Sequence, residues 1–346
     1  MTQNGTRLVL ASCEKPAWFW ALSDQLRSFS LIVAPLFFVI SVGGHGLCLW
    51  AFTYKSKSEK AYYYQKYVAL ANILDVGAFT VLSVSFQWGR DGKYAQPWFM
   101  SNYPLMFYAA HMAIPLNHAL EVTTLFLSVS MVADRVYAFS KPHQYRVSDH
   151  KLNRRLALAA SMIVGVASTV YNIRLNEVVK VNNGTSYAIE TNIAYVTSTL
   201  SSVLALVCNV IRALGLSALI GCSIALVRFY RRRISQVVSL RTGTVRNAQR
   251  EAEIKSVERS LCILTVSQSS FFGIITFCTV SYFAAAYSIP SFNGCEANVF
   301  GPLLSITHMI CDVGDACATL YTDRNTRRMI GRAFRWCTTG TCNTDD

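Results

Sequence analysis

Seven long apolar runs dominate this chain of 346 residues. A helix needs about 20 apolar residues to cross the hydrocarbon core of a bilayer, and every run is that long. Charged residues make up only 15% of the chain, well below the roughly one quarter that is typical of soluble domains. The runs predict an all-α bundle of seven transmembrane helices. They occupy residues 29–54, 66–88, 104–133, 154–173, 193–229, 260–287 and 299–321.

The net charge of +13 is distributed unevenly, and its distribution predicts an orientation. Most of the 32 Lys and Arg residues follow runs one, three, five and seven. Because cytoplasmic loops are enriched in Lys and Arg, the N-terminus is expected outside and the C-terminus inside the plasma membrane. Charge placed in this way does not indicate nucleic acid as a partner. We expect an extracellular tail over residues 1–28, a membrane domain over 29–322 and a cytoplasmic tail over 323–346.

The expected outer segments carry two kinds of candidate modification. Asn4 and Asn183 each begin an Asn-Gly-Thr sequon and are candidates for glycosylation. Among the eleven cysteines, only Cys13 and Cys295 are clearly extracellular. Since the outside is oxidising, a disulfide is predicted between these two. Residues 1–15 show no signal-peptide pattern, so the first span is expected to act as its own anchor.

A short basic and amphipathic stretch follows the last run, at residues 329–336. Its apolar residues are expected to lie on the inner leaflet, with arginines toward anionic lipid head groups. Cys337 directly follows this stretch and is a candidate for palmitoylation. An unmodified tail cysteine is the alternative.

Ionisable side chains inside apolar runs are costly in a bilayer, which makes them functional candidates. Asp75 in the second run lies close to Asn72, and Asp312 and Asp315 lie in the seventh. These four side chains predict either a hydrated polar cluster or a site for a sodium ion near Asp75. No cofactor is predicted.

A second group of ionisable residues lies in the third and fifth runs. Glu121 and Arg212 are each about half a helix from the expected outer surface, and an ion pair would lower the cost of burying both. We expect the pair to form the floor of a ligand pocket, with His111 and His118 as further candidates. A structural pair that only locks the two helices together is the alternative.

The third run ends in Asp-Arg-Val-Tyr at residues 134–137, and Pro142 follows eight residues after the acid. This string resembles the Asp/Glu-Arg-Tyr signature of rhodopsin-like G-protein-coupled receptors. The resemblance implies that Asp134 holds Arg135 at rest, and that Arg135 engages a heterotrimeric G protein when the sixth helix moves outward. Glu258, at the base of the sixth run, is then a second candidate anchor for Arg135. Tyr321 is what remains of the family motif in the seventh run.

A narrower resemblance covers parts of two runs. Ile-Pro-Leu at residues 114–116, and Val-Tyr-Asn-Ile-Arg at residues 170–174, resemble invertebrate FMRFamide-type neuropeptide receptors of nematode type. The chain departs from the family in helix six, which lacks Cys-Trp-X-Pro, and in helix seven, which lacks Asn-Pro-X-X-Tyr. It also lacks a cysteine both at the outer end of helix three and in the second outer loop.

The resemblance implies a neuropeptide receptor, and Glu177 and Glu190 in the second outer loop would suit a basic peptide. A chemosensory receptor for a small molecule is an alternative. A secondary transporter is another, because intramembrane acids also mark ion paths, although no internal repeat is evident. No enzyme is predicted, because the sequence shows no metal-ligand spacing, nucleotide loop or nucleophile elbow.

Overall fold

The computed structural model describes most of the chain. The described residues are 16–56, 62–90, 101–147, 150–181, 186–239, 245–288, 297–322, 326–328 and 330–331. Within the long helices, side-chain surroundings are not described for residues 79–90, 233–239 and 245–258.

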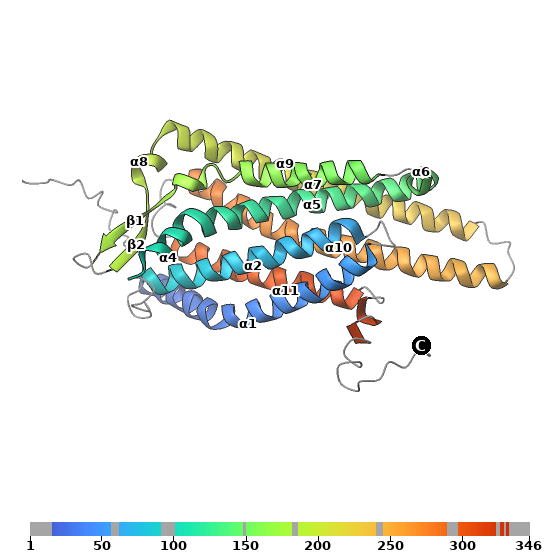
Figure 1. Cartoon of the computed structure of the whole chain (residues 1–346), viewed down its shortest axis with the longest axis horizontal. Coiled ribbons are helices and arrows are strands. Elements are labelled where there is room, and N and C mark those ends of the chain that lie inside the picture. The colour runs from blue at the N-terminus through green and yellow to red at the C-terminus, as the bar shows by residue number, and fades with distance from the viewer. Residues whose placement is uncertain are drawn as a thin grey trace, which may run out of the picture.

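Long helices running side by side form one bundle in the described part of the chain (Figure 1). These helices are α1 (Ala17–Lys55), α2 (Tyr63–Arg90), α5 (Ile114–Ser140), α7 (Lys151–Ala167), α9 (Thr199–Ser239), α10 (Val245–Ser288) and α11 (Ala297–Thr322). The short elements between them are α4 (Tyr103–Tyr108), a π-helical turn (Ala109–Ala113), α6 (Pro142–Val147), a 3-10 turn (Asn172–Arg174), the strands β1 (Asn176–Val181) and β2 (Ser186–Thr191), and α8 (Ile193–Val196).

Six helical segments among the described residues are long and apolar enough to cross a membrane. They lie in α1, in α4 continuing through α5, in α7 with the turn after it, and in α9, α10 and α11. The predicted all-α membrane bundle is therefore confirmed as a multi-pass architecture. α2 is not one of the six found in the described residues, so a seventh span stays a prediction.

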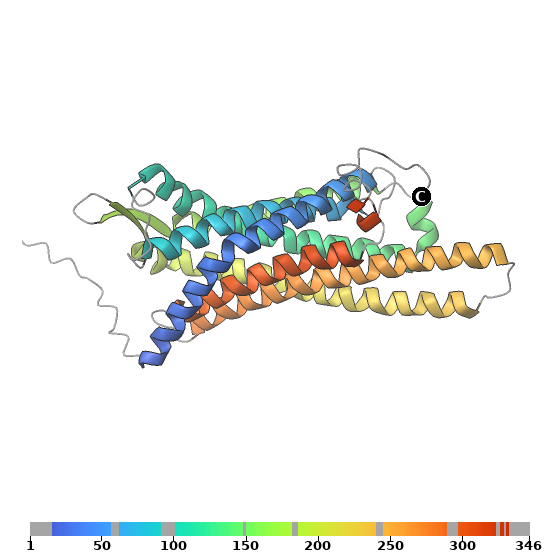
Figure 2. The same ribbon diagram turned by 90° about the horizontal axis from the view of Figure 1, so that it is seen from below.

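Helix boundaries differ from the apolar runs at two places. α1 begins at Ala17, well before residue 29, so part of the expected tail is helical. α9 and α10 continue far past their apolar segments, to Ser239 and from Val245, and they project beyond the rest of the bundle (Figures 1 and 2). The Arg, Gln and Glu residues there have high helix propensity, which lets each helix propagate from its membrane segment into polar surroundings.

Helix α5 lies at the centre of the bundle and packs against α2, α7, α9 and α10. Its buried face carries Leu125, Leu127 and Met131, which join one hydrophobic core. α7 approaches α5 closely at Gly165, where a Cβ atom would overlap the Thr123 hydroxyl. Small residues of this kind let membrane helices come into van der Waals contact.

A β-hairpin covers the end of the bundle opposite α6 (Figure 1). Its strands β1 and β2 are antiparallel, from the pair Asn176–Thr191 to the pair Val181–Ser186. Tyr187 of the hairpin packs on Tyr103 at the start of α4, with ring centroids 5.2 Å apart. The loop that the sequence placed between helices four and five is thus an ordered cap on the bundle.

Several predicted residues lie outside the described part of the chain. These are Asn4, Cys13, Asn183, Cys295 and Cys337, together with the side chain of Glu258. Of the predicted amphipathic stretch, residues 330–331 are described and are helical, as are residues 326–328 just before it. Lys55 Nζ at the end of α1 donates a hydrogen bond to Thr326 Oγ1 (2.9 Å), which joins this segment to the bundle.

Candidate functional site

Four side chains meet at the end of α5 that lies beside α6, and we call them the Asp134 cluster: Asp134, Arg135, Tyr145 and Arg154. Asp134 Oδ2 accepts hydrogen bonds from Arg135 Nη2 (3.2 Å) and from the Tyr145 hydroxyl (2.8 Å). Its Oδ1 accepts from Arg154 Nη2 (3.2 Å), and Arg154 Nη2 also donates to the Tyr145 hydroxyl (2.8 Å). One carboxylate therefore binds two arginines.

The local chain path brings these side chains together. α5 ends at Ser140, and Pro142, whose fixed φ suits the first turn of a helix, starts α6. That turn places Tyr145 beside the acid, and α7 begins at Lys151, one turn before Arg154. Burial raises the pKa of Tyr145 above its ordinary value, so its hydroxyl stays protonated and donates to Asp134.

The Asp134 cluster has more positive than negative charge in a buried place. Arg135 is only 5% exposed and Arg154 only 4%, and within the described part of the chain the Asp134 carboxylate contacts both. The sequence motif named Asp134 and Arg135 but missed Tyr145 and Arg154. Arg154 begins the fourth apolar run and reads as an ordinary flanking charge, so no local signal distinguishes it.

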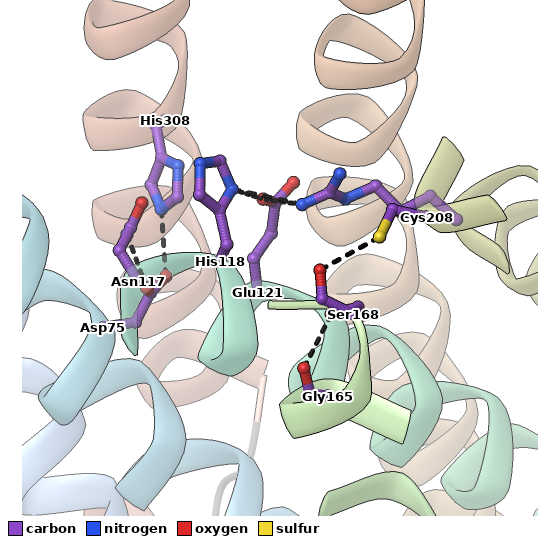
Figure 3. A network of polar contacts seen from close by, with 9 residues as sticks. Asp75, Asn117, His118, Glu121, Gly165, Ser168, Cys208 and His308 are labelled. Atoms are coloured by element: carbon purple, nitrogen blue, oxygen red, sulfur yellow. Dashed lines mark hydrogen bonds and ion pairs between the residues drawn. The ribbon is translucent and has the colours of Figure 1, made fainter. Parts of the chain in front are cut away.

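A second group of side chains, the Glu121 cluster, lies in the middle of the bundle between α5 and α9 (Figure 3). Arg212 Nη2 is 3.7 Å from Glu121 Oε2 and 3.1 Å from His118 Nδ1, and His118 Nδ1 is 3.6 Å from the same carboxylate oxygen. The predicted Glu121–Arg212 contact thus forms, with His118 beside it. His111 is not part of this cluster, because its Nδ1 lies 3.4 Å from the carbonyl oxygen of Ile173.

The third group, the Asp75 cluster, joins α2, α5 and α11 next to the Glu121 cluster (Figure 3). Asp75 Oδ1 accepts a hydrogen bond from Asn117 Nδ2 (2.7 Å). His308 Nε2 lies 3.1 Å from Asp75 Oδ2 and 3.4 Å from Asp312 Oδ2. The sequence groups Asp75 with Asp312 but does not predict His308 between them, because a histidine can be neutral and is then less costly in a bilayer than a fixed charge.

The remaining acid of α11 lies beside the Asp75 cluster. Asn72 Nδ2 of α2 donates to Asp315 Oδ2 (3.1 Å), as the predicted grouping of these two residues requires. Gln268 of α10 donates through Nε2 to Thr319 Oγ1 (3.3 Å). Polar contacts of this layer therefore link α2, α5, α10 and α11 across the bundle.

Tyr321 lies apart from these three clusters. Its side chain is 76% exposed at the end of α11, and its ring faces the Arg327 guanidinium at 5.3 Å from the centroid. Among the described residues, no group of three or more His, Cys, Asp or Glu side chains is arranged to hold a metal ion.

Comparison with known proteins gives no family. No family model matches the chain, and a search of curated proteins finds no match either. Function is therefore argued from the three clusters and from the membrane fold.

Proposed function

We propose that this protein is a rhodopsin-like G-protein-coupled receptor of the plasma membrane, with its N-terminus outside. The observation that carries the proposal is the Asp134 cluster, where a buried arginine is held by its neighbouring acid at the helix end beside α6. The extensions of α9 and α10 project at that same end, and the one on α9 carries a run of arginines (Figure 1). A buried arginine beside a basic helical extension suits a switch that meets an acidic protein surface.

The proposed switch depends on how Asp134 is shared. Arg154 occupies Asp134 Oδ1, and Tyr145 shares Oδ2 with Arg135, so Arg135 competes with two other donors for this acid. A shared partner lowers the cost of releasing Arg135 when the neighbouring helices separate. The G protein then accepts Arg135, and the energy of that contact shifts the population toward the open state.

The proposal requires α2 as the seventh span. α2 has 28 residues, which at about 1.5 Å per residue exceeds the ~30 Å hydrocarbon core. Its polar side chains Asn72 and Asp75 are buried against α11 and α5 and not toward lipid. This is where intramembrane polar groups are tolerated.

A peptide is the ligand class that the hairpin favours. The register of β1 and β2 pairs Glu177 with Glu190 directly across the strands. These two glutamates add negative charge to the hairpin sequence, which a cationic ligand would complement. An amidated basic peptide supplies a cation, whereas a neutral odorant does not. A chemosensory receptor for a small molecule is therefore less favoured than a peptide receptor.

The polar layer favours a transporter as a second candidate function. His308 joins carboxylates on two different helices, an arrangement also found along proton paths. Uptake of a solute into proteoliposomes, without any ligand-dependent G-protein response, would support that function and contradict the receptor.

The test uses the full chain in cells that carry a G-protein dissociation sensor. A panel of amidated peptides ending in Arg-Phe is applied, and we expect at least one to give a concentration-dependent signal. Arg135→Ala should abolish that signal at unchanged surface expression. Arg228→Ala, an exposed arginine on α9, is the matched control, and it should keep at least part of the response. An Arg135→Ala protein that signals like the parent would contradict the proposed switch.

A further inference from the structure

A basic and aromatic cluster lies at the end of α2 that adjoins α7, outside the three clusters described above. Lys66 Nζ of α2 faces the rings of Tyr63 and Tyr67, at 5.2 Å and 4.8 Å from their centroids. The Arg154 guanidinium lies 6.0 Å from the Tyr63 ring on the side of α7. Cation–π contacts of this kind hold a long cationic side chain in one place at the bundle surface.

Arg155 adds a second surface cation to the same cluster. It follows Arg154 on α7, its side chain is exposed, and its charge acts on Tyr63. Arg154 itself is committed to Asp134, so Lys66 and Arg155 supply the positive charge that faces outward. The rings of Tyr63 and Tyr67, both half-buried, contact the Lys66 ammonium, and their side chains hydrogen-bond each other. A phenol hydroxyl can also donate a hydrogen bond to an outside acceptor.

Each of the two cations stands at the end of an apolar stripe that faces out of the bundle. On α2, Lys66 is followed at helical spacing by Leu70 and Leu74, which are both exposed. On α7, Arg155 is followed at the same face by Met162 and Val166, which are exposed as well. Exposed apolar stripes on membrane-crossing helices face acyl chains, so the cations lie at the level of the lipid head groups.

We propose that Lys66, Arg155, Tyr63 and Tyr67 bind the phosphorylated head group of an anionic phospholipid, with its acyl chains along the two stripes. Arginine and lysine together with hydroxyl donors suit the many oxygen acceptors of a phosphoinositide. Basic sites between helix ends on the cytoplasmic side are where anionic lipid collects. The proposal rests on the membrane fold, and it needs the receptor proposal only for the choice of leaflet.

The test is lipid binding to the purified full-length protein. Native mass spectrometry in detergent follows titration with phosphatidylinositol 4,5-bisphosphate, with phosphatidylcholine as the reference lipid. We expect one preferentially retained phosphoinositide per chain. The variant Lys66→Gln/Arg155→Gln should weaken its apparent Kd about tenfold or more. Arg228→Gln/Arg231→Gln on α9 removes the same charge from another exposed place near that end and should change it little.

Two further measurements distinguish lipid binding from unfolding of the variant and from binding of the head group alone. The single variant Arg155→Gln changes an exposed side chain, so loss of lipid there does not reflect unfolding. Inositol 1,4,5-trisphosphate has the head group without acyl chains and should not displace the bound lipid. The proposal is overturned if both double variants lose lipid equally, if neither does, or if the soluble head group competes as well as the lipid. Each of these results leaves the G-protein assay unaffected, so the two proposals fail separately.

Discussion

Two ionic clusters on the same helix, α5, differ in how their charges are balanced. The Glu121 cluster pairs one carboxylate with one guanidinium at 3.7 Å, and the two partners come from different helices. The Asp134 cluster sets one carboxylate against two guanidinium groups, and one of those belongs to the next residue along the chain. The first arrangement joins α5 to α9, whereas the second leaves a surplus of positive charge at a helix end.

The two clusters differ in the free energy needed to separate their charges. Separating Glu121 from Arg212 would leave two opposite charges buried, which is expensive in a membrane interior, so that pair suits a fixed contact. Releasing Arg135 leaves Asp134 still bound to Arg154 and Tyr145, so no acid is orphaned. Separating an arginine from its acid costs less free energy where the acid keeps another partner.

Removing one member of the balanced pair is expected to have the largest effect. Arg212→Met leaves the Glu121 carboxylate buried without its guanidinium, which should cost about 3–5 kcal/mol of stability. Thermal unfolding of the purified protein, followed with a thiol-reactive dye on its buried cysteines, measures the loss. Adding Glu121→Gln to the Arg212→Met protein should restore a large part of the lost stability. An Arg212→Met protein as stable as the parent would show that the contact does not join the helices.

Packing between the two clusters is expected to matter next. A Cβ at Gly165 would overlap the Thr123 hydroxyl and lie 2.6 Å from the Ala119 carbonyl oxygen, so Gly165→Ala should cost about 1–3 kcal/mol. Gly46→Ala in α1 is the matched control, because nothing lies within 4 Å of its Cβ position. The same unfolding assay compares them. Equal melting temperatures for the two variants would mean that α7 moves away from α5 without cost.

Neutralising the shared acid is expected to release the switch. Asp134→Asn removes the carboxylate that both buried arginines contact, so Arg135 should move toward the cytoplasm more often. Ligand-independent G-protein activation should rise about tenfold, the ratio that ~1.4 kcal/mol produces. The dissociation sensor measures this at matched surface expression.

Arg154→Gln is the counterpart that sharpens the comparison. Asp134 would then keep Arg135 as its only arginine partner among the described contacts, so ligand-independent activity should fall and not rise. If Asp134→Asn and Arg154→Gln changed basal activity in the same direction, sharing of the carboxylate would not be what controls Arg135.

The smallest effect is expected at Tyr145. Tyr145→Phe removes one hydroxyl that donates to Asp134 and accepts from Arg154, a loss of about 1 kcal/mol. Basal signalling should fall by a few-fold, in the same direction as in Arg154→Gln and by less. Tyr137→Phe is a nearby control, since its hydroxyl has only a long contact of 3.4 Å with Gln144. A larger effect at Tyr137 than at Tyr145 would show that the hydrogen bond from Tyr145 to Asp134 does not control basal signalling.

The sequence predicted the charged residues that lie inside the bundle but not most of their partners. The similar depth of Glu121 and Arg212 predicts their contact, and the intramembrane polar residues Asn72 and Asp315, which the sequence groups with Asp75, are also in contact. The depth of a residue in the membrane can be inferred from the sequence because every helix crosses the same apolar layer. The rotation of each helix about its axis cannot be inferred in this way. The sequence therefore groups His111 with His118, although His111 contacts the Ile173 carbonyl in the structure.

By itself, the sequence determined that this is a helical membrane protein, since runs of apolar residues have no other stable arrangement in lipid. It also determined which charged residues lie at which depth. Only the tertiary structure decided that Asp134 is shared with Arg154 and that His308 stands between Asp75 and Asp312. Asp134 and Arg154, and likewise Asp75 and His308, lie on different helices, and contacts set by helix rotation and packing leave no local pattern in the residues.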